Sequence, residues 1–241
     1  PCGELFRYSE TGAPPCGELY SQYFEHRKMS VIETQIAYDE STITTLSSLE
    51  HIRLRSGMYI GRLGNGNHPD DGIYVLIKEV IDNGIDEFIM GYGKKIDVKL
   101  DGNELSIRDY GRGIPLGKVV ECVSRINTGA KYNSDVFQFS VGLNGVGTKA
   151  VNALSSSFMV KSHREGKFVT AYFERGILVK ETEGDTTEVD GTLVKFIADE
   201  DIFGPYSYNY SFLSKRFWYY AYLNTGLTIN FNGEKYFSKK G

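Results

Sequence analysis

The sequence contains little cysteine, no long hydrophobic run and no excess of basic residues. Its three cysteines, Cys2, Cys16 and Cys122, form no CxxC or Cys/His spacing of the kind that binds zinc. The longest unbroken apolar stretch, residues 217–223, is far shorter than the roughly 20 residues that span a bilayer, and no secretory leader is recognisable. We therefore expect a protein of the reducing cytoplasm with no membrane segment.

The charge balance adds a further exclusion. Lys and Arg number 27 and Asp and Glu number 31, so the net charge of −4 provides no broad basic surface for nucleic acid or anionic lipid. The 241 residues are 41% hydrophobic and 24% charged, which is typical of a folded chain with one large domain or two small ones. Glycine is abundant, with 27 residues, and this predicts stretches of unusual backbone geometry.

The first 28 residues differ from the rest of the chain. The hexapeptide PCGELF at residues 1–6 recurs imperfectly as PCGELY at residues 15–20, and two copies are too few for a solenoid. Met29 is a candidate for the natural start. We therefore expect residues 1–28 to be an extension outside the fold, without a function of its own.

Hydrophobic periodicity predicts an α+β fold. The clearest element is a helix over residues 72–90, because its apolar residues recur at i, i+3, i+4 and i+7. Because helices cluster early and hairpin-linked strands come later, we expect a layered domain and not a doubly wound parallel sheet. Other expected helices cover residues 42–55, 116–127, 146–154 and 212–223, with a turn at 57–61, and expected strands cover residues 96–100, 105–108, 158–163, 168–174, 177–180, 192–197, 228–231 and 235–237.

The long helix carries the first candidate constellation, which consists of Glu79, Asp82, Asn83 and Asp86. At about 100° per residue, Glu79, Asn83 and Asp86 project along one narrow stripe that borders the apolar face. Polar groups at that border can face a cavity while the helix stays anchored in the core. Taken alone, such a stripe is more often an ordinary solvated surface, although Lys78 is the only cation beside it.

The second constellation is the segment DYGRGIP at residues 109–115, directly after an expected strand. Its alternate glycines, Gly111 and Gly113, permit a tight backbone that a ligand can approach closely. The carboxylate of Asp109 can accept a hydrogen bond from an amino group such as that of adenine. An ordinary β-turn would explain the same residues if they stood alone.

The third constellation is the glycine-rich segment GLNGVGTK at residues 142–149, which leads into an expected helix. Clustered, unencumbered N–H groups at such a place suit phosphates. A Walker A loop needs Lys before Ser or Thr and a preceding strand, whereas here Thr148 precedes Lys149 and the segment before is loop-like. A dinucleotide fingerprint is also absent, because the glycine spacing is GxxGxG.

The order and spacing of these motifs resemble the Bergerat-fold ATPases, known as the GHKL group. Residues 38–241 are most similar to the ATPase region of type IIA DNA topoisomerases, with the B subunits of topoisomerase IV first and those of DNA gyrase next. The resemblance implies a two-layer α/β sandwich whose mixed, mostly antiparallel sheet is covered by helices on one face, with ATP and Mg²⁺ as cofactors. It rests on residues 55–61, 79–87, 109–115, 142–147, 151–155 and 191–192.

The resemblance also implies the roles of the polar residues on the long helix. Glu79 would be the general base for the water that attacks the γ-phosphate. Asn83 would ligate Mg²⁺, and Asp86 would hold the local structure near the base. The phosphates would be cradled by Gly142, Leu143, Asn144, Gly145, Val146, Gly147 and Thr148, with Lys131 from a closing lid.

The remaining implied contacts are with the purine and the outer edge of the pocket. Asp109 would accept from the adenine amino group, and Thr192 would support it through a hydroxyl or a water. Glu87 would pair with Arg112 beside the purine. The floor of the pocket would be Gly111, Gly113 and Ile114, and Arg164 would line its outer edge.

The domain organisation and the partners follow from the same resemblance. Residues 29–48 would be an N-terminal arm and lead-in, and residues 49–241 the ATPase domain. Tyr38 on the arm would reach into the site of a second copy of the same chain, so that nucleotide binding implies dimerisation. The topoisomerase A subunit and DNA would join in the full A2B2 enzyme, with little DNA contact by this segment. Family members continue into a transducer domain that supplies a lysine to the γ-phosphate, so we expect nucleotide binding with weak turnover.

Three alternatives stay open at this stage. The first is the B subunit of a gyrase, or an ATPase of the mismatch-repair or chaperone type within the same fold. The second is a histidine kinase, which lacks a glutamate in the role of Glu79. The third is a nucleotide-binding module without catalysis, and Glu79 argues against it because a pure binder needs no positioned base.

Overall fold

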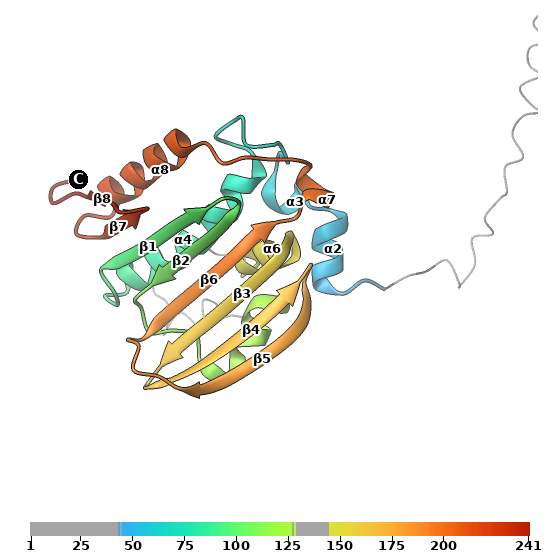
Figure 1. Cartoon of the computed structure of the whole chain (residues 1–241), viewed down its shortest axis with the longest axis horizontal. Helices are drawn as coiled ribbons and strands as arrows, with labels where there is room; N and C mark the ends of the chain where they lie inside the picture. Colours follow the sequence, from blue (N-terminus) through green and yellow to red (C-terminus); the bar gives the residue numbers. More distant parts are fainter. Residues whose placement is uncertain (1–42, 44, 127, 129–144) are drawn as a thin grey trace, which may run out of the picture. The chain divides into compact units, whose positions relative to one another are not determined.

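The computed structural model describes residue 43, residues 45–126, residue 128 and residues 145–241. The chain divides into two units, Pro1–Thr45 and Leu46–Gly241, and every helix and strand named below belongs to the second unit (Figure 1). The division into an extension, an arm and an ATPase domain stays a prediction. Within the described ranges, no helix combines the length and the apolar character that crossing a membrane requires.

Eight strands form one mixed sheet in the order β5-β4-β3-β6-β2-β1-β7-β8. Among these described strands, β1 and β7 run parallel and every other neighbouring pair is antiparallel. The prediction of a mixed, mostly antiparallel sheet is therefore confirmed. The strands are β1 (Lys95–Asp101), β2 (Glu104–Asp109), β3 (Ser155–Arg164), β4 (Lys167–Glu174), β5 (Ile177–Asp185), β6 (Gly191–Ala198), β7 (Thr228–Phe231) and β8 (Glu234–Phe237).

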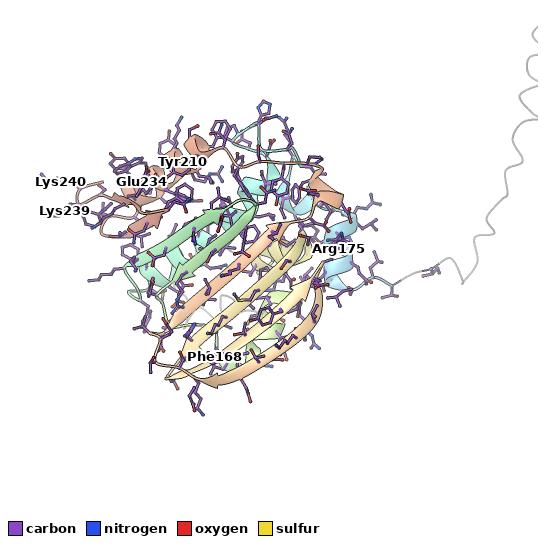
Figure 2. The ribbon with its side chains drawn as sticks, in the orientation of Figure 1. Phe168, Arg175, Tyr210, Glu234, Lys239 and Lys240 are labelled. Carbon is purple, nitrogen blue, oxygen red and sulfur yellow. The ribbon has the colours of Figure 1, made fainter. Side chains whose placement is uncertain are left out.

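Helices pack against one face of this sheet, and the longest is α4 (Gly72–Ile89). Most of its apolar residues, from Ile73 to Ile85, are buried in the core, whereas Ile89 at its end is exposed, and the helix contacts both β2 and α6 (Gly147–Ala153). In Figure 1, α4 and α6 lie behind the sheet, whereas the face toward the viewer carries strand side chains such as Phe168 of β4 (Figure 2). The other helical elements are α2 (Ser48–Leu54), α3 (Gly57–Ile60), the 3-10 turn η2 (Leu116–Lys118), α5 (Val119–Ser124), α7 (Glu200–Phe203) and α8 (Tyr210–Leu223).

The structure corrects the expected helices at several ends. The helix expected over residues 42–55 begins only at Ser48, because Ser47 and Glu50 form a capping box that fixes the start there. Residues 116–127 contain η2 and then the short α5, and the expected turn at 57–61 is largely helical in α3. The four-residue α7 was not predicted, since it is too short to show periodicity; its N-cap Asp199 accepts a hydrogen bond from the N–H of Asp201.

Candidate functional site

The polar stripe of α4 lies largely inside the molecule. Asp86 has no exposed surface and Asp82 is 4% exposed, while the side chain of Glu79 is 28% exposed. The stripe borders the apolar face of α4, so packing of that face against β2 and α6 draws the carboxylates inward. This burial rejects the interpretation of the stripe as an ordinary solvated surface.

Two contacts join the stripe to the start of α6. The side-chain amide of Asn83 donates hydrogen bonds of 2.9 Å to the Thr148 hydroxyl and of 2.9 Å to the backbone carbonyl of Glu79. Gly147 lies so close to Glu79 that a Cβ atom built on this glycine would overlap Oε2 of the carboxylate. The predicted base, the predicted metal ligand and the end of the glycine-rich segment therefore meet in one place.

The predicted adenine acceptor, Asp109, ends β2 and lies against the same helix. A Cβ built on Gly84 of α4 would be 2.9 Å from Cδ1 of Ile96 and 3.2 Å from the Cβ of Asp109, so the glycine lets the strand end approach the helix closely. One oxygen of the carboxylate, Oδ1, accepts hydrogen bonds from the N–H of Gly111 at 2.9 Å and of Thr192 at 3.1 Å. Burial raises the pKa of Asp109 to about 6, against the lowering effect of these two N–H donors.

The loop after Asp109 is fixed by an ion pair that the sequence predicted. Arg112 donates to Glu87 from its backbone N–H at 2.9 Å, from Nε at 3.0 Å and from Nη2 at 2.9 Å. Its guanidinium also lies 4.3 Å from the ring centroid of Tyr92. Because a side chain at Gly111 would overlap Glu87, the glycine is what allows the loop to reach α4.

The second glycine of this loop brings it against β3 and β6. Gly113 has a φ of 72°, and a Cβ there would lie 2.5 Å from the His163 carbonyl and 3.3 Å from the Gly191 carbonyl. The hydroxyl of Ser162 donates a 2.7 Å hydrogen bond to the carbonyl of Ile114. The predicted floor of the pocket, residues 111–114, is thus held between α4 and the ends of two central strands.

The structure places several other predicted residues without testing their roles toward a nucleotide. Thr192 contacts Asp109 through its backbone N–H, and its support of the adenine through a hydroxyl or a water stays a prediction. Arg164, at the end of β3, pairs through Nε with Glu165 at 3.2 Å, and its role at the outer edge stays a prediction. Gly145 has a φ of 60°, and Val146 is the N-cap of α6 and packs against the core. Five predicted contacts lie outside the described residues: Tyr38, Lys131, Gly142, Leu143 and Asn144.

Sequence reasoning did not predict the contacts of three polar residues around the site. Lys78 pairs with Asp82 at 2.5 Å and with Glu79 at 3.7 Å; the i,i+4 spacing of Lys78 and Asp82 was the available indication. The buried Lys149 donates through Nζ to the carbonyl of Thr128 at 2.6 Å. Neither this contact nor that of Ser162 has a local sequence pattern, because each joins segments far apart in the chain.

The side chains of Asn83 and Glu79 offer oxygen ligands to a cation. Asn83 directs its amide nitrogen to Thr148 and to the helix backbone, so its amide oxygen is the atom suited to a hard metal ion, with the Glu79 carboxylate nearby. Among the described residues, no group of three or more His, Cys, Asp and Glu side chains forms a site made of protein ligands alone. The donor set therefore fits a magnesium ion that takes most of its ligands from phosphates and water.

Comparison with known proteins links this geometry to one family. The family model for histidine kinase-, DNA gyrase B- and HSP90-like ATPases matches residues 69–189. The B subunit of DNA topoisomerase 4 from Borreliella burgdorferi is 68% identical over 204 residues, which cover 85% of this chain and 34% of that protein. The B subunit of DNA gyrase from Mycolicibacterium smegmatis is 36% identical over 207 residues, which cover 82% of this chain and 30% of that protein. The chain thus spans about a third of the length of these relatives.

A solved structure gives the same result for the fold. The 43K ATPase domain of Thermus thermophilus gyrase B, determined in complex with an aminocoumarin, matches with a TM-score of 0.66 and 31% identity, over 80% of this chain and 52% of that one. The expected Bergerat fold is therefore confirmed. Since the family model covers half of the chain, including α4 and the loop after β2, the chain belongs to the histidine kinase-, DNA gyrase B- and HSP90-like ATPase family.

Proposed function

We propose that this chain binds ATP with Mg²⁺ and hydrolyses it as the ATPase domain in the B subunit of a bacterial topoisomerase IV. The observation that carries the proposal is the meeting of Glu79, Asn83 and Thr148 at one end of the site with Asp109 packed on the same helix. One end of this arrangement is suited to phosphates and a cation, and the other presents a buried carboxylate to a purine amino group.

The residues of the site have separate roles in binding and hydrolysis. Asp109 receives the adenine amino group and fixes the orientation of the nucleotide. Glu79, with Oε2 directed toward Gly147, holds the attacking water and accepts its proton. Asn83 and Thr148 hold the position of the cation, and Mg²⁺, when bound, neutralises charge on the phosphate oxygens.

The whole assembly is part of the same proposal. The 68% identity to a topoisomerase IV relative, against 36% to a gyrase relative, favours the former. The partners would be a second copy of this chain through Tyr38, the topoisomerase A subunit, and DNA passed between them. Such an enzyme works on chromosomes, so we place it in the bacterial cytoplasm, where ATP closes a dimer gate that drives strand passage.

Two substitutions test the proposal. Glu79→Ala is expected to keep ATP affinity and to abolish hydrolysis, because it removes the base and leaves the purine site intact. Asp109→Asn is expected to lose ATP binding, because it places an amide donor where an acceptor is needed. Isothermal titration with a non-hydrolysable ATP analogue and a phosphate-release assay provide the two readouts.

Glu121→Ala serves as a matched control, because it removes a surface carboxylate of α5 that pairs only with the exposed Lys118 among the described contacts. It should bind and hydrolyse ATP like the unmodified chain. Normal ATP binding by Asp109→Asn would overturn the adenine assignment, and normal hydrolysis by Glu79→Ala would overturn the catalytic one.

A further inference from the structure

The ammonium group of Lys78 lies between two carboxylates of α4. Its Nζ is 2.5 Å from Oδ2 of Asp82 and 3.7 Å from Oε1 of Glu79. The Lys78 side chain is 42% exposed, whereas that of Asp82 is 5% exposed. An ion pair between two exposed side chains would leave both free to move. Here the buried partner fixes the place of the cation.

Asp82 is buried and lies near Tyr220 of α8. Burial and then the neighbouring Asp82 carboxylate raise the pKa of the Tyr220 phenol far above its usual value, against the opposing charge of Arg216. Burial alone would lower the pKa of Lys78, but its hydrogen bond to Asp82 and the charge of Glu79 raise it overall. Lys78 therefore stays protonated.

The two oxygens of Glu79 consequently have different neighbours. Oε1 faces the Lys78 ammonium, and Oε2 faces Gly147 at the start of α6. A glutamate side chain on a helix has three rotatable bonds, and 28% of the Glu79 side chain is exposed, so its two oxygens need fixed neighbours to keep one orientation. A fixed cation beside one oxygen holds the other toward the glycine-rich segment.

We propose that Lys78 is a positioning residue for hydrolysis, which acts through Glu79 by holding Oε2 of that carboxylate toward the start of α6. The inference rests on the proposed role of Glu79 as the base. Lys78 contacts neither the purine side of the site nor Asn83 in any described interaction, so its effect falls on the chemical step and not on nucleotide binding.

Single-turnover hydrolysis with the chain in excess over Mg·ATP tests this role. Lys78→Met should slow the Glu79-dependent rate roughly tenfold, the size expected when a catalytic group is misplaced by a fraction of an ångström. The affinity for a non-hydrolysable ATP analogue should change less than about twofold. Lys78→Arg, which keeps a cation of similar reach, should restore at least half of the rate.

Two further variants make the result specific. The double variant Lys78→Met/Glu79→Gln should be no slower than Glu79→Gln alone, since Lys78 acts only through that carboxylate. Lys118→Met removes another ion-paired lysine, 2.9 Å from Glu121 and without a described ion pair to α4, and should leave the rate unchanged. At fixed pH 8, the ¹³C resonance of the Glu79 carboxyl, assigned by its loss in Glu79→Gln, should move in Lys78→Met and not in Lys118→Met.

The outcomes separate the two proposals. A Lys78→Met protein that hydrolyses at the unmodified rate, or that loses rate and affinity together without rescue by arginine, overturns the role of Lys78 and leaves that of Glu79 intact. If Glu79→Gln itself hydrolyses ATP normally, the proposed function fails, whatever Lys78 does.

Discussion

The side-chain amide of Asn83 donates a 2.9 Å hydrogen bond to the hydroxyl of Thr148, 65 positions later in the chain. This bond joins the long helix α4 to the first turn of α6. It also occupies the amide nitrogen, so the amide oxygen is set in a defined direction. The orientation of the predicted magnesium ligand thus depends on a residue at the end of the glycine-rich segment.

We predict that Thr148→Val weakens magnesium-dependent nucleotide binding. The valine has the same shape but no acceptor, so the Asn83 amide loses a partner at a cost of about 1 kcal/mol, or roughly fivefold in affinity. Titration with an ATP analogue, with Mg²⁺ and with EDTA, measures the effect. Thr148→Ser keeps the hydroxyl and should bind like the unmodified chain. Equal affinities of the Val and Ser variants with Mg²⁺ would contradict the role given to this bond.

We also predict that Gly147→Ala impairs hydrolysis more than folding. A methyl group at this position overlaps the end of the Glu79 side chain, which can move away, so the stability cost should stay within about 1 kcal/mol. The displaced carboxylate no longer holds its place, and the hydrolysis rate should fall at least tenfold. Thermal unfolding and phosphate release measure the two effects.

The matched background for this variant is Glu79→Ala. When the Glu79 side chain is absent, the alanine at position 147 has no carboxylate to displace. The double variant should therefore bind an ATP analogue as Glu79→Ala does. A further loss of affinity in the double variant would show that the methyl group acts on something other than Glu79.

Much of the fold follows from local pattern. The spacing of apolar residues placed α4 within one residue of its observed end, because one face of this long helix is buried over most of its length. The strands of the β1–β2 hairpin were predicted at residues 96–100 and 105–108 for a similar reason, since apolar alternation marks both; in the structure Asp101 pairs with Glu104 across the two-residue turn Gly102-Asn103. Elements as short as α7 lack enough residues to show a period.

The site was only partly predictable for a different reason. The side-chain types of Glu79, Asn83 and Asp109 indicate what chemistry they can perform, and the resemblance to the Bergerat-fold ATPases supplied their roles. The contribution of Thr192 is a backbone N–H, which every residue except proline carries, so the sequence does not single it out. The contact of Lys78 with Glu79 depends on the burial of Asp82, which is a tertiary property.

The raised pKa of Asp109 leads to a prediction about stability. Its pKa is about 6 in the fold, against an ordinary value of 3.8. The folded chain therefore holds this proton more tightly, and stability should fall as pH rises through this window, by about 3 kcal/mol from this group. Asp109→Asn cannot ionise and should lack this contribution. Urea unfolding of both proteins from pH 4 to pH 8 measures this contribution. If the difference between their free energies of unfolding stays constant over this range, the raised pKa of Asp109 is contradicted.

Nucleotide affinity should also depend on the ionisation of Asp109, but it should rise with pH where stability falls. The ionised carboxylate is the better acceptor for an amino group, so affinity for an ATP analogue should rise as pH increases from 5 to 7 and then level off. A GTP analogue, which carries a carbonyl where adenine has its amino group, provides the control and should bind poorly throughout. Fluorescence titration at a series of pH values gives the profile, and an affinity for ATP that is flat across this range would argue against contact with Asp109.

The last prediction compares two glycines with similar backbone geometry. Gly113 and Gly102 have φ of 72° and 58°, so alanine at either position should cost about 1 kcal/mol in conformational strain. The two positions differ in the room around them. A Cβ at Gly102 meets nothing within 4 Å, whereas one at Gly113 meets the His163 carbonyl at 2.5 Å. Backbone cannot move aside as a flexible side chain can, so Gly113→Ala should be the more destabilising by at least about 2 kcal/mol and should weaken ATP binding. Urea unfolding measures both variants, and equal losses would show that φ alone explains the glycine in this loop.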